Sequence, residues 1–225
     1  MDYARNKLSS PKEGNKSDTD RQDAPSAQSH PEKKPSDRWG LLTEISNFFT
    51  RNGLKNSIVF GLEAYLSAFF AFFPGPEGFF LRRLLYGRLA QKTGPSLLIF
   101  NNVKIIFGNR IGFGTRVAIN SGSYIDARGG LTIGSGTMIG PNNVLVSVNH
   151  GSQRTDQPMW QQPLEFGQIE IGEDVWTGAN VTILAGAKIG KGAIIGAGSV
   201  VTGEIPEFAI ALGIPAKVTQ IRGKS

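Results

Sequence analysis

Aliphatic residues recur every six positions through the second half of the chain, and polar or small residues follow each of them. Neither an α-helix nor a β-hairpin has this period, because a helix repeats every ~3.6 residues and a strand every two. A fixed repeat of this kind is typical of a solenoid of stacked coils. The positions that share the register are Ile111, Val117, Ile133, Ile139, Ile171, Ile183, Ile189, Ile195 and Val201.

The six-residue unit has a simple physical interpretation. Each unit makes a short strand and a tight corner, three units close a triangular coil, and stacked coils bury one column of aliphatic side chains. Glycines in the repeat supply corner conformations that a Cβ would strain. We therefore expect a mainly β protein with a parallel β-helix from residue 101 to 225. The register breaks at His150 and resumes near Ile169, so residues 150–168 should leave the coil as a loop.

Residues 39–100 form an apolar segment that precedes the repeat. Nine of the fourteen phenylalanines of the chain fall between Phe48 and Phe80. The apolar run from Ser57 to Phe73 contains Glu63 and ends at a proline, so it is too short and too interrupted for a membrane span of about 20 residues. The segment is expected to be helical.

Its second half has the pattern of an amphipathic helix lying on a membrane surface. Apolar Phe79, Phe80, Leu84 and Leu85 alternate with basic Arg82, Arg83, Arg88 and Lys92. This pattern predicts peripheral membrane contact through residues 39–92. The pattern also fits helices that pack on the β-helix or on a neighbouring subunit.

Residues 1–38 are rich in Ser, Pro, Lys and Asp and contain almost no aliphatic side chains. Such a segment cannot bury enough apolar surface to offset its conformational entropy, so we expect a disordered tail in which His30 is solvated. It lacks the apolar stretch of a secretory signal, so the chain is expected to be cytoplasmic.

The amino-acid composition excludes several kinds of catalytic and metal-binding site. The 225 residues include no cysteine and only two histidines, His30 and His150, which excludes thiol nucleophiles and three-histidine zinc sites, so no metal is expected. The net charge is +6, but the basic residues neither form a long run nor alternate with stacking aromatic residues in the repeat. Nucleic acid is therefore not an expected partner.

From Asn101 to Arg222 the chain resembles the hexapeptide-repeat acyltransferases, and within them the galactoside, maltose and polysaccharide O-acetyltransferases. The resemblance rests on INSGSYIDARGG at 119–130, on VSVNH ending at His150, on the repeats of 169–206 and on GIPAK at 213–217. It implies a left-handed β-helix and a homotrimer with active sites between adjacent subunits. Acetyl-CoA is the implied co-substrate.

The resemblance also assigns roles to residues of the acceptor site. His150 matches the catalytic base, whose neutral imidazole takes the proton from the acceptor hydroxyl as that oxygen attacks the thioester. Asn120 matches an asparagine that binds the acceptor sugar, although an asparagine at a tight corner has a structural explanation as well. Asp126 is a candidate for holding the acceptor or orienting the imidazole. Met159 and Trp160 either line the acceptor pocket or hold the loop against the β-helix.

The implied cofactor groove consists mainly of backbone and small side chains. The matching positions are Trp176, Ala179, Ala197, Thr202 and Gly203, with Lys217 and Arg222 as candidates for the nucleotide phosphates. Small residues at Ala179 and Ala197 are also what the packing of a coil requires.

These observations predict an acetyl-CoA-dependent O-acetyltransferase that acts on a hydroxyl of a sugar. The apolar segment is unlike the more polar beginnings of the soluble sugar acetyltransferases, and it suggests a cell-surface or lipid-linked polysaccharide precursor at the inner face of the cytoplasmic membrane. Two other interpretations stay open. One is acyl transfer to an amino sugar, serine or an antibiotic, and the other is a non-catalytic β-helix that serves as an assembly subunit.

Overall fold

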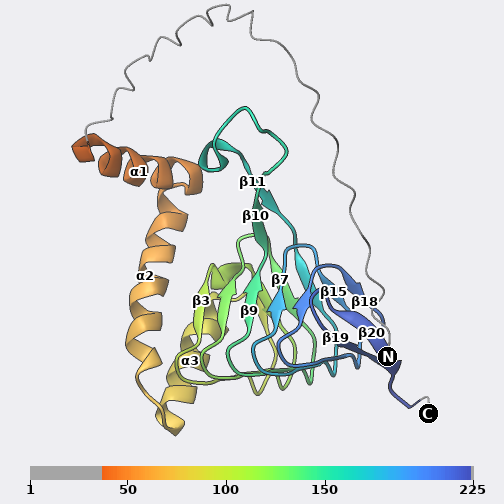
Figure 1. The fold of residues 1–225 in the computed structure, drawn as a ribbon. Helices are drawn as coiled ribbons and strands as arrows, with labels where there is room; N and C mark the ends of the chain where they lie inside the picture. Colours follow the sequence, from red (N-terminus) through yellow and green to blue (C-terminus); the bar gives the residue numbers. More distant parts are fainter. Residues whose placement is uncertain (1–36, 224–225) are drawn as a thin grey trace, which may run out of the picture. The chain divides into compact units, whose positions relative to one another are not determined.

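The computed structural model describes residues 37–223 (Figure 1). Three helices come first: α1 (Asp37–Asn52), α2 (Leu54–Ala71) and α3 (Pro76–Leu89). Residues from Glu44 onward form one compact unit. The expected disordered tail, with His30, lies outside the described residues apart from Asp37 and Arg38, which begin α1.

Short strands after the helices form three sheets, and each coil passes through sheet A, sheet B and sheet C in turn. Sheet A contains β1 (Lys92–Thr93), β4 (Ile111–Phe113), β7 (Leu131–Ile133), β12 (Ile169–Ile171), β15 (Lys188–Ile189) and β18 (Glu204–Ile205). Sheet B contains β2 (Leu98–Ile99), β5 (Ala118–Ile119), β8 (Met138–Ile139), β13 (Trp176–Thr177), β16 (Ile194–Ile195), β19 (Ala209–Leu212) and β20 (Lys217–Ile221). Sheet C contains β3 (Lys104–Ile106), β6 (Tyr124–Asp126), β9 (Val144–Val146), β14 (Thr182–Ile183) and β17 (Val200–Val201).

Successive coils stack in parallel register, which confirms the predicted β-helix. Ile171 of β12 pairs with Ile189 of β15, one coil further along the chain. The amide of Gly172 donates to the carbonyl of Ile189 at 2.8 Å, so the coils are tied together by backbone hydrogen bonds as in an ordinary parallel sheet. Among the described strands of the three sheets, only β20 runs antiparallel to its neighbour, β19, at the last edge of sheet B.

The nine predicted positions lie in the core, but a second residue of most units, such as Ile119 or Leu131, is buried as well. Ile111 pairs with Leu131 and Phe113 pairs with Ile133, so the core contains more than one column of inward-pointing side chains. All nine positions of the six-residue register are at most 3% exposed. Burying one isoleucine or valine side chain stabilises the folded state by about 1.5–3 kcal/mol, so these buried side chains supply the main stabilising term of the fold. Corners between strands repeatedly take left-handed backbone conformations, at Gly136 and Gly198 but also at Asn142 and Asn180.

The β-helix begins before residue 101, where the repeat was expected to start. β1 pairs with β4, β2 pairs with β5, and Leu97 and Ile99 are fully buried in the core. The expected helical segment therefore ends at Leu89, and residues 92–100 belong to the first coil. This coil lacks the aliphatic-glycine pattern of the later repeats, so its strands could not be recognised from the period.

Helix α3 caps the open end of the first coil. Tyr86 is 1% exposed and belongs to the same core as Leu97 and Ile99, while Leu85 and Leu89 pack against that core. An uncapped end coil would leave both its apolar interior and its strand edges in water. For the inner face of α3, packing on the β-helix is therefore the correct interpretation.

Arg82 was expected among the basic residues of a membrane-facing surface, and this expectation is wrong. Its side chain is 2% exposed, its Nε donates to the carbonyl of Ile99 at 2.7 Å, and one terminal nitrogen donates to the carbonyls of Phe70 and Phe73 at 2.8 Å each. Carbonyls at the end of a helix lack partners within the helix, and a guanidinium can satisfy several of them at once. Arg82 therefore joins the end of α2 to β2.

Polar contacts hold α2 on the β-helix as well. The Tyr86 hydroxyl donates to Ser67 Oγ at 2.7 Å, and the Gly108 amide donates to Glu63 Oε1 at 2.8 Å. The rings of Phe60 and Phe107 pack nearby, with centroids 5.2 Å apart. None of the helices in residues 37–223 is long and apolar enough to cross a membrane.

The buried carboxyl of Glu63 makes the stability of this contact depend on pH. Burial raises the pKa of Glu63 above its ordinary value of 4.5, and backbone hydrogen bonds from Gly108 and Phe107 only partly oppose the shift. Because the folded state holds the proton more tightly than the unfolded state, the contribution of Glu63 to the free energy of unfolding falls as the pH rises above 4.5.

We predict that Glu63→Gln removes this pH dependence and raises the unfolding temperature at neutral pH, because glutamine keeps an acceptor for Gly108 without a buried charge. Thermal unfolding midpoints measured from acid to neutral pH test this. Glu77→Gln, which neutralises an exposed carboxylate on α3, is the matched control. Parallel curves for wild type and Glu63→Gln would contradict the prediction.

Candidate active site

A two-stranded ribbon projects from the coils where the sequence predicts a loop (Figure 1). β10 (Val148–His150) pairs antiparallel with β11 (Leu164–Phe166), and the amide of Gly167 closes the root by donating to the carbonyl of Ser147 at 3.0 Å. The excursion therefore starts after Ser147 instead of at His150. Leu131 of β7 pairs directly with Ile169 of β12, so the ribbon leaves the stacking of the coils uninterrupted.

His150 lies in the first strand of the ribbon and is exposed to solvent. It pairs with Leu164, and Val148 and Phe166 pair next to it on the same face because side chains alternate along a strand. The residues that share this face of the ribbon with the imidazole are therefore apolar. Within the described residues no carboxylate bonds to it.

The tip of the ribbon is fixed by Gln162, which the sequence analysis missed. Its side chain is buried, Nε2 donates to the carbonyl of Arg154 at 2.8 Å, and Oε1 accepts from the amide of Arg154 at 3.2 Å. Met159 and Trp160, in the short helix η2 (Met159–Gln161), are 52% and 71% exposed. In one chain they do not hold the tip against the β-helix, and they are available to line a pocket.

Asp126 ends β6 and lies below the root of the ribbon. Its buried carboxylate accepts from Arg128, at 3.0 Å from Nε and 2.7 Å from a terminal nitrogen, and from the Arg128 amide at 3.1 Å. Its backbone carbonyl accepts from Ser147 Oγ at 2.8 Å. Within one chain Asp126 thus braces the corner from which the ribbon departs. The only sequence signal for Arg128 was its position two residues after the acid.

Asn120 follows β5 directly, at the corner between sheets B and C. Its Nδ2 donates to the carbonyl of Ile139 at 3.0 Å, and its amide donates to the same carbonyl at 2.9 Å. Its backbone is not left-handed, so the corner conformation is not what requires asparagine here. The side chain is half-buried and oriented by the next coil.

Three candidate cofactor residues belong to the same part of the molecule. Trp176 begins β13, pairs with Met138 and Ile194, and is 49% exposed. Ala179 and Ala197 follow at the corner between sheets B and C. A Cβ at Gly178 would lie 2.7 Å from the amide nitrogen of Ala197, so the coils approach closely at this corner. The strip offers backbone and methyl groups to a long thin ligand, which fits a pantetheine arm.

Thr202 and Gly203 lie at the corner between sheets C and A, and both are exposed. A Cβ at Gly203 would meet nothing within 4 Å, so this corner is open to a ligand.

Lys217 and Arg222, the two phosphate candidates, lie at opposite ends of β20. Lys217 is exposed and pairs with Leu212. Arg222 forms an ion pair with Asp174 at 3.3 Å and donates to the carbonyl of Gly192 at 2.6 Å. The structure does not bring the two cations together, and the guanidinium already has protein partners.

Seven of the candidate residues fall into two groups, which lie at opposite ends of the strands of sheet C. His150, Asp126, Thr202 and Gly203 belong to the corner that leads from sheet C to sheet A. Asn120, Ala179 and Ala197 belong to the corner that leads from sheet B to sheet C. One chain therefore holds these candidate residues in two separate groups.

A depression of about 510 Å³ lies elsewhere, on sheet A. The ion pairs Glu170–Lys188 and Glu173–Lys191, at 3.2 Å each, contribute to its lining, and His150 and Asn120 do not. Within residues 37–223, no three histidine or acidic side chains converge in a way that would hold a metal ion.

Comparison with known proteins gives consistent results. Residues 168–203 match the family model of the bacterial transferase hexapeptide (six repeats). A putative acetyltransferase of Staphylococcus aureus (strain COL) is 34% identical over 62% of this chain and 69% of its own length. The putative lipopolysaccharide biosynthesis O-acetyl transferase WbbJ of Escherichia coli (strain K12) is 38% identical over 47% of this chain.

A solved structure extends the comparison to the fold. A galactoside acetyltransferase in complex with coenzyme A superposes with a TM-score of 0.65 at 27% identity, over 72% of this chain and 80% of the other. The first curated relatives are longer than the aligned part, because this chain covers 58%, 41% and 45% of their lengths. The chain thus spans about half the length of these relatives.

The root of the ribbon offers a test of the site's rigidity. A Cβ at Gly129 would overlap the carbonyl oxygen of Ser147 and lie 3.0 Å from the amide nitrogen of Gly167. We predict that Gly129→Ala costs about 1–3 kcal/mol of stability, as overpacking typically does, and displaces the ribbon. Denaturant unfolding measures the first effect, and protease sensitivity between β10 and β11 measures the second.

The matched control is Gly112→Ala, where the new Cβ would lie an ordinary 3.7 Å from the methyl group of Thr132. Equal stability of the two variants would mean that the root tolerates a side chain and does not fix the ribbon.

Proposed function

We propose that this chain, which belongs to the hexapeptide-repeat acetyltransferase family, transfers an acetyl group from acetyl-CoA to a hydroxyl group of a sugar. The observation that carries the proposal is the exposed His150, presented on a braced ribbon beside a fold whose solved relative binds coenzyme A. Related proteins named as lipopolysaccharide and galactoside O-acetyltransferases support a sugar as the acceptor.

His150 acts as the general base. Its neutral imidazole takes the proton of the acceptor hydroxyl while that oxygen forms a bond to the acetyl carbonyl carbon. Acetyl-CoA, when bound, supplies the thioester whose carbon–sulfur bond breaks. The imidazolium then returns its proton to the departing sulfur, so the histidine ends the cycle neutral. Leu164 and Phe166 lie on the same face of the ribbon as the ring and offer apolar contact to a bound reactant.

Other residues bind and orient the reactants. Asn120 hydrogen-bonds the sugar, and its amide is already oriented by the carbonyl of Ile139. Met159 and Trp160 contribute apolar surface to the acceptor pocket. Asp126 acts through Arg128 and Ser147, by fixing the corner below His150.

Acetyl-CoA would lie along small and exposed positions. Trp176, Ala179, Ala197, Thr202 and Gly203 would contact the pantetheine arm. Lys217 is the better candidate for a phosphate, because Arg222 is engaged by Asp174 and Gly192.

The active assembly is a homotrimer in which each site lies between two subunits. The division of candidate residues within one chain supports this. His150 follows the strands of sheet C, at the corner to sheet A, and Asn120 precedes them, at the corner from sheet B. The interface in a cyclic trimer is heterologous, so two different surfaces meet. The corner from sheet C to sheet A of one subunit would face the corner from sheet B to sheet C of the next. Each site then receives its base from one subunit and its asparagine from the neighbour.

We predict that His150→Ala lowers the rate of acetyl transfer by roughly 10²- to 10⁴-fold, the usual worth of general-base assistance, while acetyl-CoA still binds. Steady-state rates and calorimetric titration with acetyl-CoA measure the two effects. Glu165→Gln changes a neighbouring side chain on the opposite face of the ribbon and should keep most of the activity. Wild-type turnover by His150→Ala would remove the histidine from the mechanism.

Mixing two inactive variants tests the shared site. Co-refolded His150→Ala and Asn120→Ala chains should regain roughly a quarter of wild-type activity, because each mixed cyclic trimer contains one intact site. Each variant refolded alone should stay inactive. If the mixture also stays inactive although mixed trimers form, His150 and Asn120 act within one chain or Asn120 is not part of the site.

A further inference from the structure

Helix α2 is apolar on the side that faces solvent and polar on the side that faces the protein. Ser57, Glu63 and Ser67 are buried, and Glu63 is the only charged residue from Ser57 to Phe73. Large apolar side chains are exposed instead, with Tyr65 at 82% and Phe72 at 81%. A surface helix of a soluble protein has the opposite arrangement.

The exposed side chains form one continuous strip. They recur at intervals of three or four residues, which places them on one face of the helix. The strip, which we call the docking face, consists of Ile58, Leu62, Tyr65, Leu66, Phe69 and Phe72. It extends about 20 Å along α2 at the usual rise of a helix. An apolar strip of this size on a protein surface usually has a partner.

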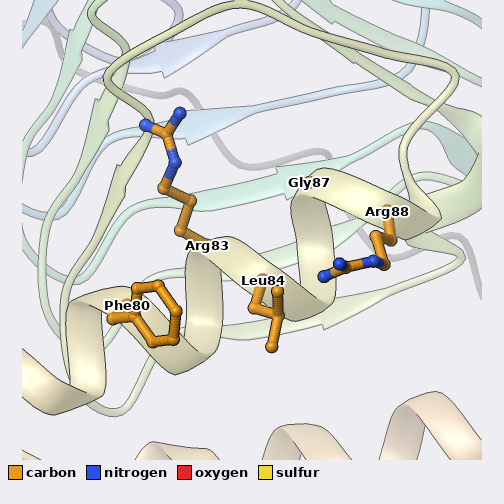
Figure 2. Close-up of a pocket in the computed structure, with 5 residues that line it drawn as sticks. All are labelled: Phe80, Arg83, Leu84, Gly87 and Arg88. Carbon is orange, nitrogen blue, oxygen red and sulfur yellow. The ribbon is translucent and has the colours of Figure 1, made fainter.

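Exposed cations on neighbouring α3 indicate what that partner is. Phe80, Arg83, Leu84, Gly87 and Arg88 line a shallow pocket of about 200 Å³, and Figure 2 shows them along successive turns of the helix. Phe80 and Leu84 are exposed, as are both arginines. Within the described residues neither guanidinium makes a hydrogen bond or an ion pair. The cations therefore lack counterions beside the apolar side chains.

We propose that the docking face and the α3 pocket together bind the surface of an anionic membrane. An apolar strip without charge enters the boundary of the acyl chains, while Arg83 and Arg88 meet phosphate groups of the lipid heads. Tyr65 contributes a ring with a polar end, which suits the boundary between lipid and water. A second copy of the same face would instead bring the unpaired arginines close to one another.

The orientation of α2 explains why membrane contact leaves the fold intact. The contacts that hold α2 on the protein use its polar side, through Glu63 and Ser67, and the backbone at its end, through Arg82. The apolar side is not needed for them. Binding to a bilayer can therefore bury the docking face without unpacking the helix. This inference stands apart from acetyl transfer, which uses the ribbon and the corners of sheet C.

Vesicle flotation with the full chain tests the proposal. We expect binding to vesicles of equal parts phosphatidylcholine and phosphatidylglycerol, and much weaker binding to phosphatidylcholine alone. Deleting the helices would be a poor test, because Tyr86 fills the end of the core. The first variant therefore replaces exposed residues only: Leu62→Ser, Tyr65→Ser and Phe72→Ser together should lower binding by roughly a hundredfold.

The second variant, Arg83→Gln with Arg88→Gln, should lower binding on the order of tenfold at low salt and less at high salt, because the term it removes is electrostatic. The matched control is Lys188→Gln with Lys191→Gln, which removes the same charge from sheet A and should bind like the wild type. Unfolding midpoints and acetyl transfer to a soluble sugar check that both variants are folded.

Three results would overturn the proposal. The wild-type chain could stay unbound with both vesicles, or the serine variant could bind as tightly as the wild type. The third is a wild-type assembly larger than a trimer that the serine variant reduces to a trimer, which would show that the docking face joins copies of the protein. Loss of acetyl transfer in the His150 variant alone would leave the membrane result untouched.

Discussion

The aliphatic side chains inside each coil are buried only because the next coil covers them. Every coil therefore depends on its neighbours, and the end coils depend on something else. Tyr86 of α3 closes the column beside Leu97 and Ile99, and β20 turns back along β19 at the other end of sheet B. The same dependence explains how an excursion is tolerated. Because Ile169 pairs directly with Leu131, the ribbon that carries His150 adds residues at a corner without removing any stacking contact.

The sequence predicted the repeating coils, the helical segment before them and the excursion, but it missed the first coil, which lacks the repeat pattern. Nine aliphatic positions recognised from the period of six all proved to be buried, because each unit must point apolar side chains inward for the coil to close. Leu97 and Ile99 were assigned to the helical segment, since the first coil lacks the glycine pattern. Arg82 was taken for a surface cation because helical periodicity groups it with Arg83. Only the packed structure shows that carbonyls of α2 and β2 use its donors.

The site was predicted one residue at a time, whereas its arrangement required the structure. The motif around His150 indicated a candidate base, but whether Asn120 lies on the same corner depends on which sheet each strand joins. Spacing along the chain does not determine that. Asp126 shows the same limit, because its carboxylate is bound by Arg128 and its carbonyl supports Ser147. The bonds within one chain show that this acid supports the corner below the histidine, a role that its position in the sequence did not indicate.

Sheet C connects the two surfaces for which we propose functions, the ribbon of His150 and the docking face. α2 packs on β3, the edge strand, and β6 and β9 follow it in the sheet. β6 ends at Asp126, and β9 leads through Ser147 into the ribbon of His150. Hydrogen bonds between successive strands make this path stiff, so the position of the imidazole relative to the docking face is set by the sheet and not by a flexible linker. A bilayer bound to α2 would hold the proposed base, His150, at a fixed distance from the lipid heads, which suits an acceptor sugar carried on a lipid.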